Sequence, residues 1–187
     1  MRLFIALPLP EVGRLSLIAY QQMLRRHLND NVRWTSHDQL HLTLKFLGET
    51  PDDLLPALGQ LVREAAAGAQ PISARWSHSL GAFPHLQAPR VLWRGLQEGA
   101  EAVSQLAARL ESAVVALGLP AEERSFAAHV TLGRVRPAAV GRRLAAAIEP
   151  VEGETFLLGR LELIESVLLP QGPQYTTRVA ASLGVGG

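Results

Sequence analysis

The chain contains no cysteine and only one lysine, Lys45, among its 18 basic residues. The absence of cysteine excludes disulfides, thiolate metal sites and cysteine nucleophiles. The 18 basic residues are balanced by 17 acidic ones, and the formal charge of +1 lacks the basic excess typical of broad, charge-driven nucleic-acid binding. With 48% hydrophobic and 19% charged residues, the composition indicates a folded protein rather than a disordered one.

The sequence also lacks any hydrophobic run near the roughly 18 residues that a membrane span needs. Its apolar opening is interrupted by Pro8 and Pro10 and has no small-residue cleavage site, which favours a buried strand over a signal peptide. We therefore expect a soluble, cytoplasmic protein without a membrane partner. Sequence patterns for a zinc site, a P-loop, a dinucleotide-binding turn and a nucleophile elbow are absent, so we expect no metal and no cofactor.

The predicted elements repeat along the chain. Strands are predicted at Leu3–Leu7, Leu40–Phe46, Ile72–Phe83, Val91–Gly95, His129–Arg134, Thr155–Leu169 and Tyr175–Leu183. Helices are predicted from Glu11, after Thr50 as N-cap with Pro51 in the first position, over Glu98–Leu117 and over Ala138–Ile148. The interval from Leu3 to His41 equals that from Val91 to His129. We therefore predict one domain over 1–187, built as two similar lobes from halves of about 1–86 and 87–187, with a central cleft between them.

Each half carries a His-x-Thr pattern within a predicted strand: His41-Leu42-Thr43 and His129-Val130-Thr131. Because side chains alternate along a strand, His and Thr share one face while the apolar residue faces a core. A single copy of this pattern is common by chance. It would indicate a structural histidine whose hydrogen bonds are made by neighbouring residues on a half-buried strand. Two copies in matching positions favour a shared site.

Two imidazoles and two hydroxyls around one point suit in-line displacement at phosphorus. A neutral imidazole accepts the proton of an attacking water, and an imidazolium protonates the departing oxygen. The hydroxyls of Thr43 and Thr131 can donate hydrogen bonds to the non-bridging oxygens, where charge is accommodated. The residues alone leave open which of His41 and His129 is the acid.

The sequence resembles the two-histidine (2H) phosphoesterases, in particular the RNA 2′,3′-cyclic phosphodiesterases formerly called 2′-5′ RNA ligases. The similarity covers nearly the whole chain and includes Arg2-Leu3-Phe4-Ile5-Ala6-Leu7, Val32-Arg33-Trp34, His41-Leu42-Thr43-Leu44-Lys45-Phe46-Leu47-Gly48, Gly81-Ala82-Phe83-Pro84, Pro89-Arg90-Val91-Leu92-Trp93, Ser125-Phe126-Ala127-Ala128-His129-Val130-Thr131-Leu132-Gly133-Arg134 and Gly172-Pro173-Gln174-Tyr175. Relatives usually have proline where this chain has Ala128.

The resemblance implies an α+β fold whose two lobes are mostly antiparallel sheets flanked by helices. It also implies hydrolysis of a 2′,3′-cyclic phosphate, on RNA or a nucleotide, to a 2′-phosphate without a metal. In that reaction His41 is the proton donor to the 3′-oxygen and His129 is the proton acceptor. No protein partner is implied.

Four further residues are candidate substrate contacts. Arg134 matches a position that the family uses for phosphate or nucleotide contact, although strict alternation places it opposite His129 unless a bulge at Gly133 intervenes. Lys45, four residues after His41, is expected to share its face and to contact phosphate, or else to be a surface lysine.

Phe126 and Tyr175 could stack on a base, with core packing as the alternative for Phe126. The three tryptophans, Trp34, Trp76 and Trp93, are expected in the core.

Two alternative functions stay open at this point. One is ATP-independent 2′-5′ RNA ligation, in which an RNA 5′-hydroxyl replaces water as the nucleophile. The other is a module that binds nucleotides or RNA ends without turnover, which has no need for a matched acid and base.

Overall fold

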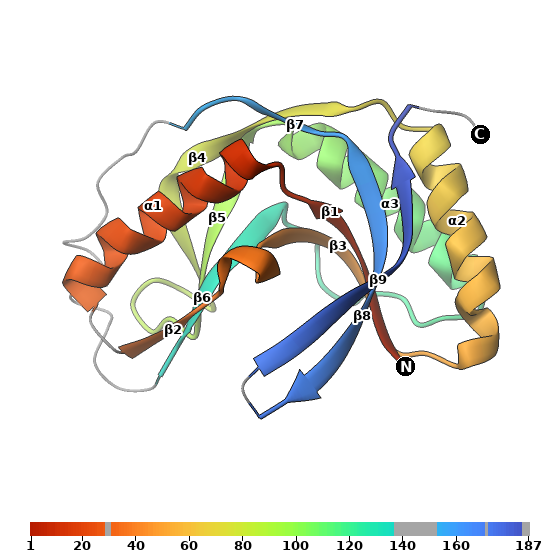
Figure 1. Cartoon of the computed structure of the whole chain (residues 1–187), viewed down its shortest axis with the longest axis horizontal. Coiled ribbons are helices and arrows are strands. Elements are labelled where there is room, and N and C mark those ends of the chain that lie inside the picture. The colour runs from red at the N-terminus through yellow and green to blue at the C-terminus, as the bar shows by residue number, and fades with distance from the viewer. Residues whose placement is uncertain (29–30, 137–152, 171, 185–187) are drawn as a thin grey trace.

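The structure is a computed structural model that describes residues 1–28, 31–136, 153–170 and 172–184. Two antiparallel sheets form its centre, and helices pack on their outer faces (Figure 1). Sheet 1 has the order β3 (His41–Glu49), β1 (Arg2–Pro8), β8 (Arg160–Leu169) and β9 (Gly172–Ser182). Sheet 2 has the order β2 (Val32–Trp34), β6 (His129–Val135), β5 (Val91–Glu98), β4 (Ile72–Phe83) and β7 (Phe156–Leu158). The predicted α+β class with two antiparallel lobes is confirmed.

The lobes do not coincide with the two halves of the sequence, and that part of the prediction is wrong. β8 and β9, from the second half, complete sheet 1, while β2 and β4, from the first half, belong to sheet 2. Each sheet therefore depends on both halves of the chain. The prediction of a helix over Ala138–Ile148 lies outside the described residues.

In the described part of the chain, three helices pack against the sheets. α1 (Glu11–Leu28) lies over sheet 2, where the indole nitrogen of Trp76 donates a hydrogen bond to the carbonyl oxygen of Gly13 at 3.1 Å. α2 (Leu55–Ala67) packs on β8 and β9, and α3 (Ala100–Ala116) contacts strands of both sheets. Among the described residues, no helix is long and apolar enough to cross a membrane.

The second helix begins later than the sequence predicts. Thr50 does not cap it: its backbone exchanges hydrogen bonds with Met1, which continues the pairing of β1 with β3, and its hydroxyl donates to the carbonyl oxygen of Gly48. A short 3₁₀ turn, η3 (Asp52–Leu54), follows before α2 begins. Strand pairing at Thr50 thus delays the helix by one turn.

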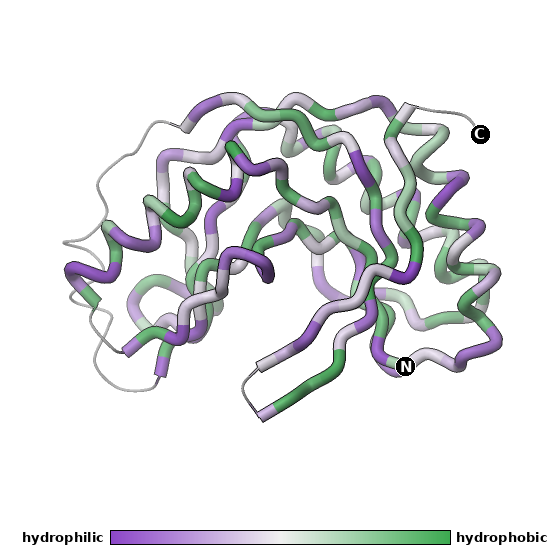
Figure 2. Tube along the Cα trace, viewed as in Figure 1, coloured by the Kyte–Doolittle hydropathy of each residue, from purple (hydrophilic) through white to green (hydrophobic). Residues whose placement is uncertain are grey.

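β1 is buried on both faces, as its uninterrupted apolar sequence predicts. Leu3, Ile5 and Leu7 point into the main core. Phe4 and Ala6 point the opposite way and form a second, small apolar cluster with Ile164, against which Tyr175 packs. Figure 2 shows the hydrophobic stretch of β1 in the middle of the molecule, whereas α1 alternates between hydrophobic and hydrophilic residues. The small cluster matters because it supports one of the two histidines.

Candidate active site

The two His-x-Thr strands contain matching irregularities. In β3 the partner strand pairs with Thr43 and then with Lys45, so that Leu44 is skipped. In β6 the partner pairs with Thr131 and then with Gly133, so that Leu132 is skipped. Each skipped residue is the one directly after the threonine. Because an extra residue reverses the alternation of side chains, both strands change faces at the same point.

This irregularity decides the position of two candidate residues. Arg134 is turned onto the face of His129 and Thr131, where it is exposed, as the bulge considered from the sequence requires. Lys45 is turned away from His41, and the prediction that it shares the face of His41 is wrong. Its ammonium lies 2.7 Å from the Glu111 carboxylate and donates a hydrogen bond to the Pro120 carbonyl oxygen at 3.1 Å, with only 5% of the residue exposed. Lys45 is therefore a buried structural cation.

His41 lies in an aromatic setting on sheet 1. Its ring stacks on that of Phe4, with 4.8 Å between ring centroids, and meets the ring of Tyr175 edge-on at 5.3 Å. Its Nδ1 lies 2.8 Å from the carbonyl oxygen of Gln39, in the 3₁₀ turn η2 (His37–Gln39) before β3. These contacts fix the position and tilt of the ring.

His129 has an equivalent setting on sheet 2. Its ring lies 5.2 Å from that of Phe83 and 5.6 Å from that of Trp93. Its Nδ1 lies 2.7 Å from the carbonyl oxygen of Ala127. In both lobes, therefore, an aromatic wall holds the imidazole and the carbonyl two residues earlier binds Nδ1.

These hydrogen bonds determine the tautomer. A carbonyl oxygen only accepts, so Nδ1 carries the proton in each ring and Nε2 is left for proton exchange. Burial among apolar groups lowers the pKa of His41 from 6.5 to about 4, an effect that the Gln39 carbonyl partly offsets. Burial also lowers the pKa of His129, again partly offset by its backbone acceptor. Both rings are consequently neutral bases in the free protein near neutral pH.

Three observations relate the two sheets in space. β3 and β6, the strands that carry them, lie against each other. Burial raises the pKa of Tyr175, on sheet 1, and the positive charge of Arg134, on sheet 2, partly opposes this, so the two side chains are within electrostatic range of each other. At the tip of the β8–β9 hairpin, a methyl group at Gly172 would lie 2.8 Å from the guanidinium of Arg33 in β2. The Arg33 side chain could move aside, but the φ of 138° at Gly172 is one that residues with a side chain rarely adopt.

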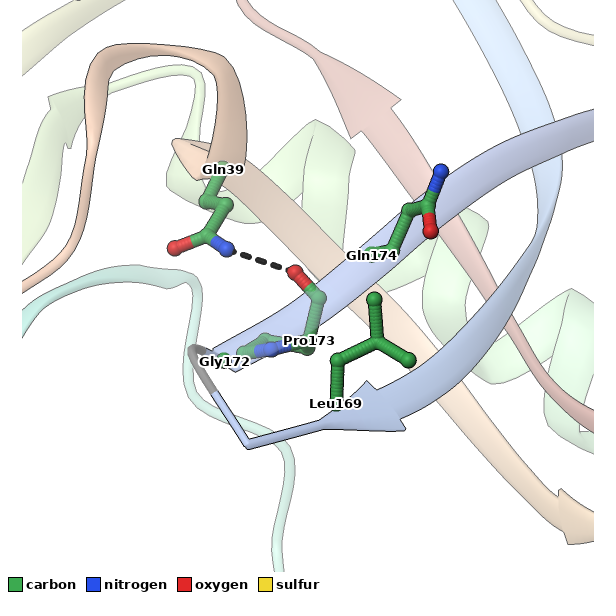
Figure 3. A pocket seen from close by; sticks show the side chains of 5 residues that line it. All are labelled: Gln39, Leu169, Gly172, Pro173 and Gln174. Carbon is green, nitrogen blue, oxygen red and sulfur yellow. Dashed lines mark hydrogen bonds between the residues drawn. The ribbon is translucent and has the colours of Figure 1, made fainter.

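A pocket of about 360 Å³ lies beside the hairpin tip, lined by Gln39, Leu169, Gly172, Pro173 and Gln174 (Figure 3). The side chain of Gln39 points toward Pro173 and donates a hydrogen bond to its carbonyl oxygen at 2.7 Å. Gln39 thus links the hairpin to His41, whose Nδ1 binds the Gln39 backbone.

A second pocket, of about 320 Å³, is lined in part by Trp93 and by Ala127 and Ala128, the two residues before His129. Each candidate histidine therefore has a pocket next to the backbone that orients it.

Several residues of this site were not expected from the sequence. Phe4, Phe83 and Trp93 form the aromatic walls, although Trp93 was expected in the core. Phe46 occupies in β3 the place that Arg134 occupies in β6, five residues after the histidine, and 61% of it is exposed. Trp93 pairs with Thr131 across the strands and so shares its face, a relation that neither strand's sequence contains by itself.

The other candidates have different surroundings. Thr43 and Thr131 are half-buried, two residues after their histidines on the same strands. Tyr175 lies directly beside His41. Phe126 is 37% exposed in the segment before β6 rather than in the core. Stacking of a base on Phe126 or Tyr175 stays a prediction. Within the described part of the chain, no group of three or more acidic or histidine side chains is placed to hold a metal ion.

Comparison with known proteins identifies a family. The family model described as the 2′-5′ RNA ligase superfamily matches residues 14–167. An RNA 2′,3′-cyclic phosphodiesterase of Thermus thermophilus is 36% identical over 193 aligned positions, which cover 98% of this chain and 90% of the relative. The enzyme of the same name from Methanothermobacter thermautotrophicus is 32% identical over 180 positions, covering 94% of this chain and 95% of the relative.

Solved structures have the same architecture. The protein TT0787 of Thermus thermophilus is 33% identical and superposes with a TM-score of 0.85 over 98% of both chains. LigT of E. coli, crystallised with 3′-AMP, is 26% identical and superposes with a TM-score of 0.76 over 97% of both chains.

Proposed function

Because this chain belongs to the 2′-5′ RNA ligase superfamily, we propose that it hydrolyses the 2′,3′-cyclic phosphate at the end of an RNA or nucleotide to a 2′-phosphate. The observation that carries this proposal is the paired arrangement of His41 and His129. Each ring is oriented by a backbone carbonyl and exchanges protons through Nε2, and the strands that carry them lie against each other. The names of the relatives support the same activity.

The proposed reaction is a single displacement at phosphorus. Nε2 of His129 accepts a proton from water as the water oxygen bonds to phosphorus. The bond from phosphorus to the ribose 3′-oxygen breaks, and the imidazolium of His41 gives its proton to that oxygen. The product carries a 3′-hydroxyl and a 2′-phosphate. His129 ends the turnover protonated and His41 neutral, so both exchange protons with solvent before the next turnover.

The remaining residues stabilise charge and hold the substrate. The Thr43 and Thr131 hydroxyls donate hydrogen bonds to the non-bridging oxygens, on which charge accumulates in the transition state. Arg134, on the face of His129, attracts the anionic phosphate. The assignment of His41 as donor follows the resemblance to the family and requires the substrate's own negative charge, because burial disfavours the His41 imidazolium.

The first prediction concerns the reaction itself. The purified protein is expected to open a 2′,3′-cyclic nucleotide in the presence of EDTA, because imidazoles and hydroxyls supply the whole chemistry. Phosphorus NMR of the product is expected to show only the 2′-monoester. A strict requirement for a divalent cation, or a 3′-phosphate product, would contradict the proposal.

The same assay separates the two alternatives. A 2′-5′ junction formed from RNA fragments bearing a cyclic phosphate and a 5′-hydroxyl would indicate ligation. Tight binding without any product would indicate a binding module. The predicted cytoplasmic location stays a prediction.

The second prediction concerns pH. Catalysis needs one imidazole bare and the other protonated, so kcat/KM falls in acid as the base is protonated and falls in alkali as the acid loses its proton. Because burial lowers the pKa of both histidines below 6.5 in the free protein, we expect the maximum of kcat/KM below pH 6.5. A bound anionic phosphate favours the imidazolium, so the maximum of kcat is expected at higher pH than that of kcat/KM. Profiles of both constants, measured at fixed ionic strength, test this order. Coincident maxima above pH 7 would contradict it.

A further inference from the structure

Arg2 is an exposed residue at the start of β1, on the face of the sheet that carries the candidate site. It lies two positions before Phe4, the ring on which His41 stacks, so alternation places Arg2 on the same face as Phe4. Along β1, Arg2 is about 7 Å from Phe4. This distance is similar to the separation of successive phosphates in single-stranded RNA.

The register of sheet 1 aligns Arg2 with Tyr175. Leu3 pairs with Glu165, so the next position places Arg2 opposite Ser166, and Ser166 pairs with Tyr175. Arg2 and Tyr175 are therefore two strands apart, or about 10 Å between backbones, with only the small side chain of Ser166 between them. Two long side chains can meet across that interval.

The electrostatics of Tyr175 agree with this alignment. Burial raises the pKa of its hydroxyl, and the positive charges of Arg134 and Arg2 both lower it. One guanidinium comes from each sheet, and the Tyr175 ring meets the His41 ring edge-on, with 5.3 Å between ring centroids. Two carboxylates lie on this face of β1 and its neighbours. Glu49 pairs with Arg2 across the strands and is exposed, and Glu162 pairs with Ala6, four positions along β1 from Arg2.

We propose that Arg2 and the Tyr175 hydroxyl bind the phosphodiester immediately preceding the cyclic end, so that the protein prefers an oligonucleotide to a mononucleotide. The inference rests on the proposed function and adds its substrate class. Arginine suits this role because its planar fork of donors matches two phosphate oxygens. Arg134, on the face of β6 that carries His129, serves the reacting phosphate, while Arg2 lies on β1, about 7 Å beyond Phe4. A mononucleotide has no group to occupy this subsite.

The test compares two substrates: a 2′,3′-cyclic mononucleotide and a trinucleotide ending in the same cyclic nucleotide. The native protein is expected to have the lower KM for the trinucleotide, with an advantage that shrinks as salt increases. Arg2→Gln removes the charge from an exposed position and is expected to raise the KM for the trinucleotide by about tenfold, leaving the mononucleotide constants unchanged.

The matched control is Arg178→Gln, which alters another exposed arginine of sheet 1, paired with Glu165 at 3.4 Å. It is expected to affect neither substrate. Equal KM values of the native protein for both substrates, or equal effects of Arg2→Gln on both, would overturn the inference while leaving hydrolysis intact. Failure of the native protein to open the mononucleotide would instead overturn the proposed function.

Discussion

Alanine at position 41 or at position 129 is expected to lower kcat for a 2′,3′-cyclic nucleotide by about a thousandfold. Each variant removes one of the two proposed proton transfers, and a positioned acid or base contributes roughly a hundred- to ten-thousandfold. Either loss alone should nearly abolish turnover, because the two transfers serve one displacement. Steady-state rates with circular dichroism of each variant measure the effect.

Asparagine substitutions distinguish the loss of proton transfer from the loss of packing around each histidine. His41→Asn and His129→Asn keep a donor near the position of Nδ1, and so the hydrogen bonds to Gln39 and Ala127, but remove Nε2. They are expected to be as inactive as the alanine variants and more stable. His27→Ala, at an exposed position near the end of α1, is the matched control with full activity. A fully active variant at position 41 or 129 would remove that histidine from the mechanism.

A substrate with a better leaving group distinguishes the acid from the base. Nitrophenolate departs from an aryl phosphodiester without protonation, whereas the attacking water still requires a base. If His41 is the donor, His41→Asn should recover most of its activity on the aryl ester and His129→Asn should not. The reverse result would exchange the two roles and leave the paired mechanism in place.

The sequence predicted the pair of histidine strands because that signal is local and repeated. Both His-x-Thr patterns fall on strands with His and Thr half-buried and the intervening Leu42 or Val130 fully buried. The apolar run of β1 likewise predicted a buried strand. Such features depend on alternation within one segment.

Features that depend on pairing between segments were not predictable in the same way. The skipped residues Leu44 and Leu132 are ordinary leucines. Gly133 suggested a possible bulge in β6, but no residue next to Leu44 suggests one in β3. Strict alternation therefore placed Lys45 on the wrong face and left Arg134 undecided. The exchange of strands between halves was also hidden, because β4 and β8 are typical strands whichever sheet they join. Both features became visible only from the pairing of strands that are far apart in the sequence.

Replacement of Lys45 by methionine tests the clearest of these corrections. The ammonium is buried against β3 and α3, where it is paired with Glu111 and bound to the Pro120 carbonyl. Lys45→Met leaves the Glu111 carboxylate without its cation. Because the Glu111 side chain is still 31% exposed, we expect a loss of about 1–3 kcal/mol in the free energy of unfolding, less than for a fully buried pair. Urea denaturation at pH 7 measures it.

A kinetic measurement on the same variant distinguishes a phosphate-binding role of Lys45 from a structural one. A lysine that bound phosphate on the face of His41 would cost little stability when replaced and would raise KM. A lysine that ties β3 to the end of α3 should do the opposite, with KM unchanged at temperatures where the variant is folded. Glu111→Gln is the matched variant, because it removes the same ion pair by changing the other residue. The double variant should lose less free energy of unfolding than the two single variants lose together, because the ion pair is broken only once. An unchanged free energy of unfolding for Lys45→Met, together with a raised KM, would return Lys45 to the substrate site.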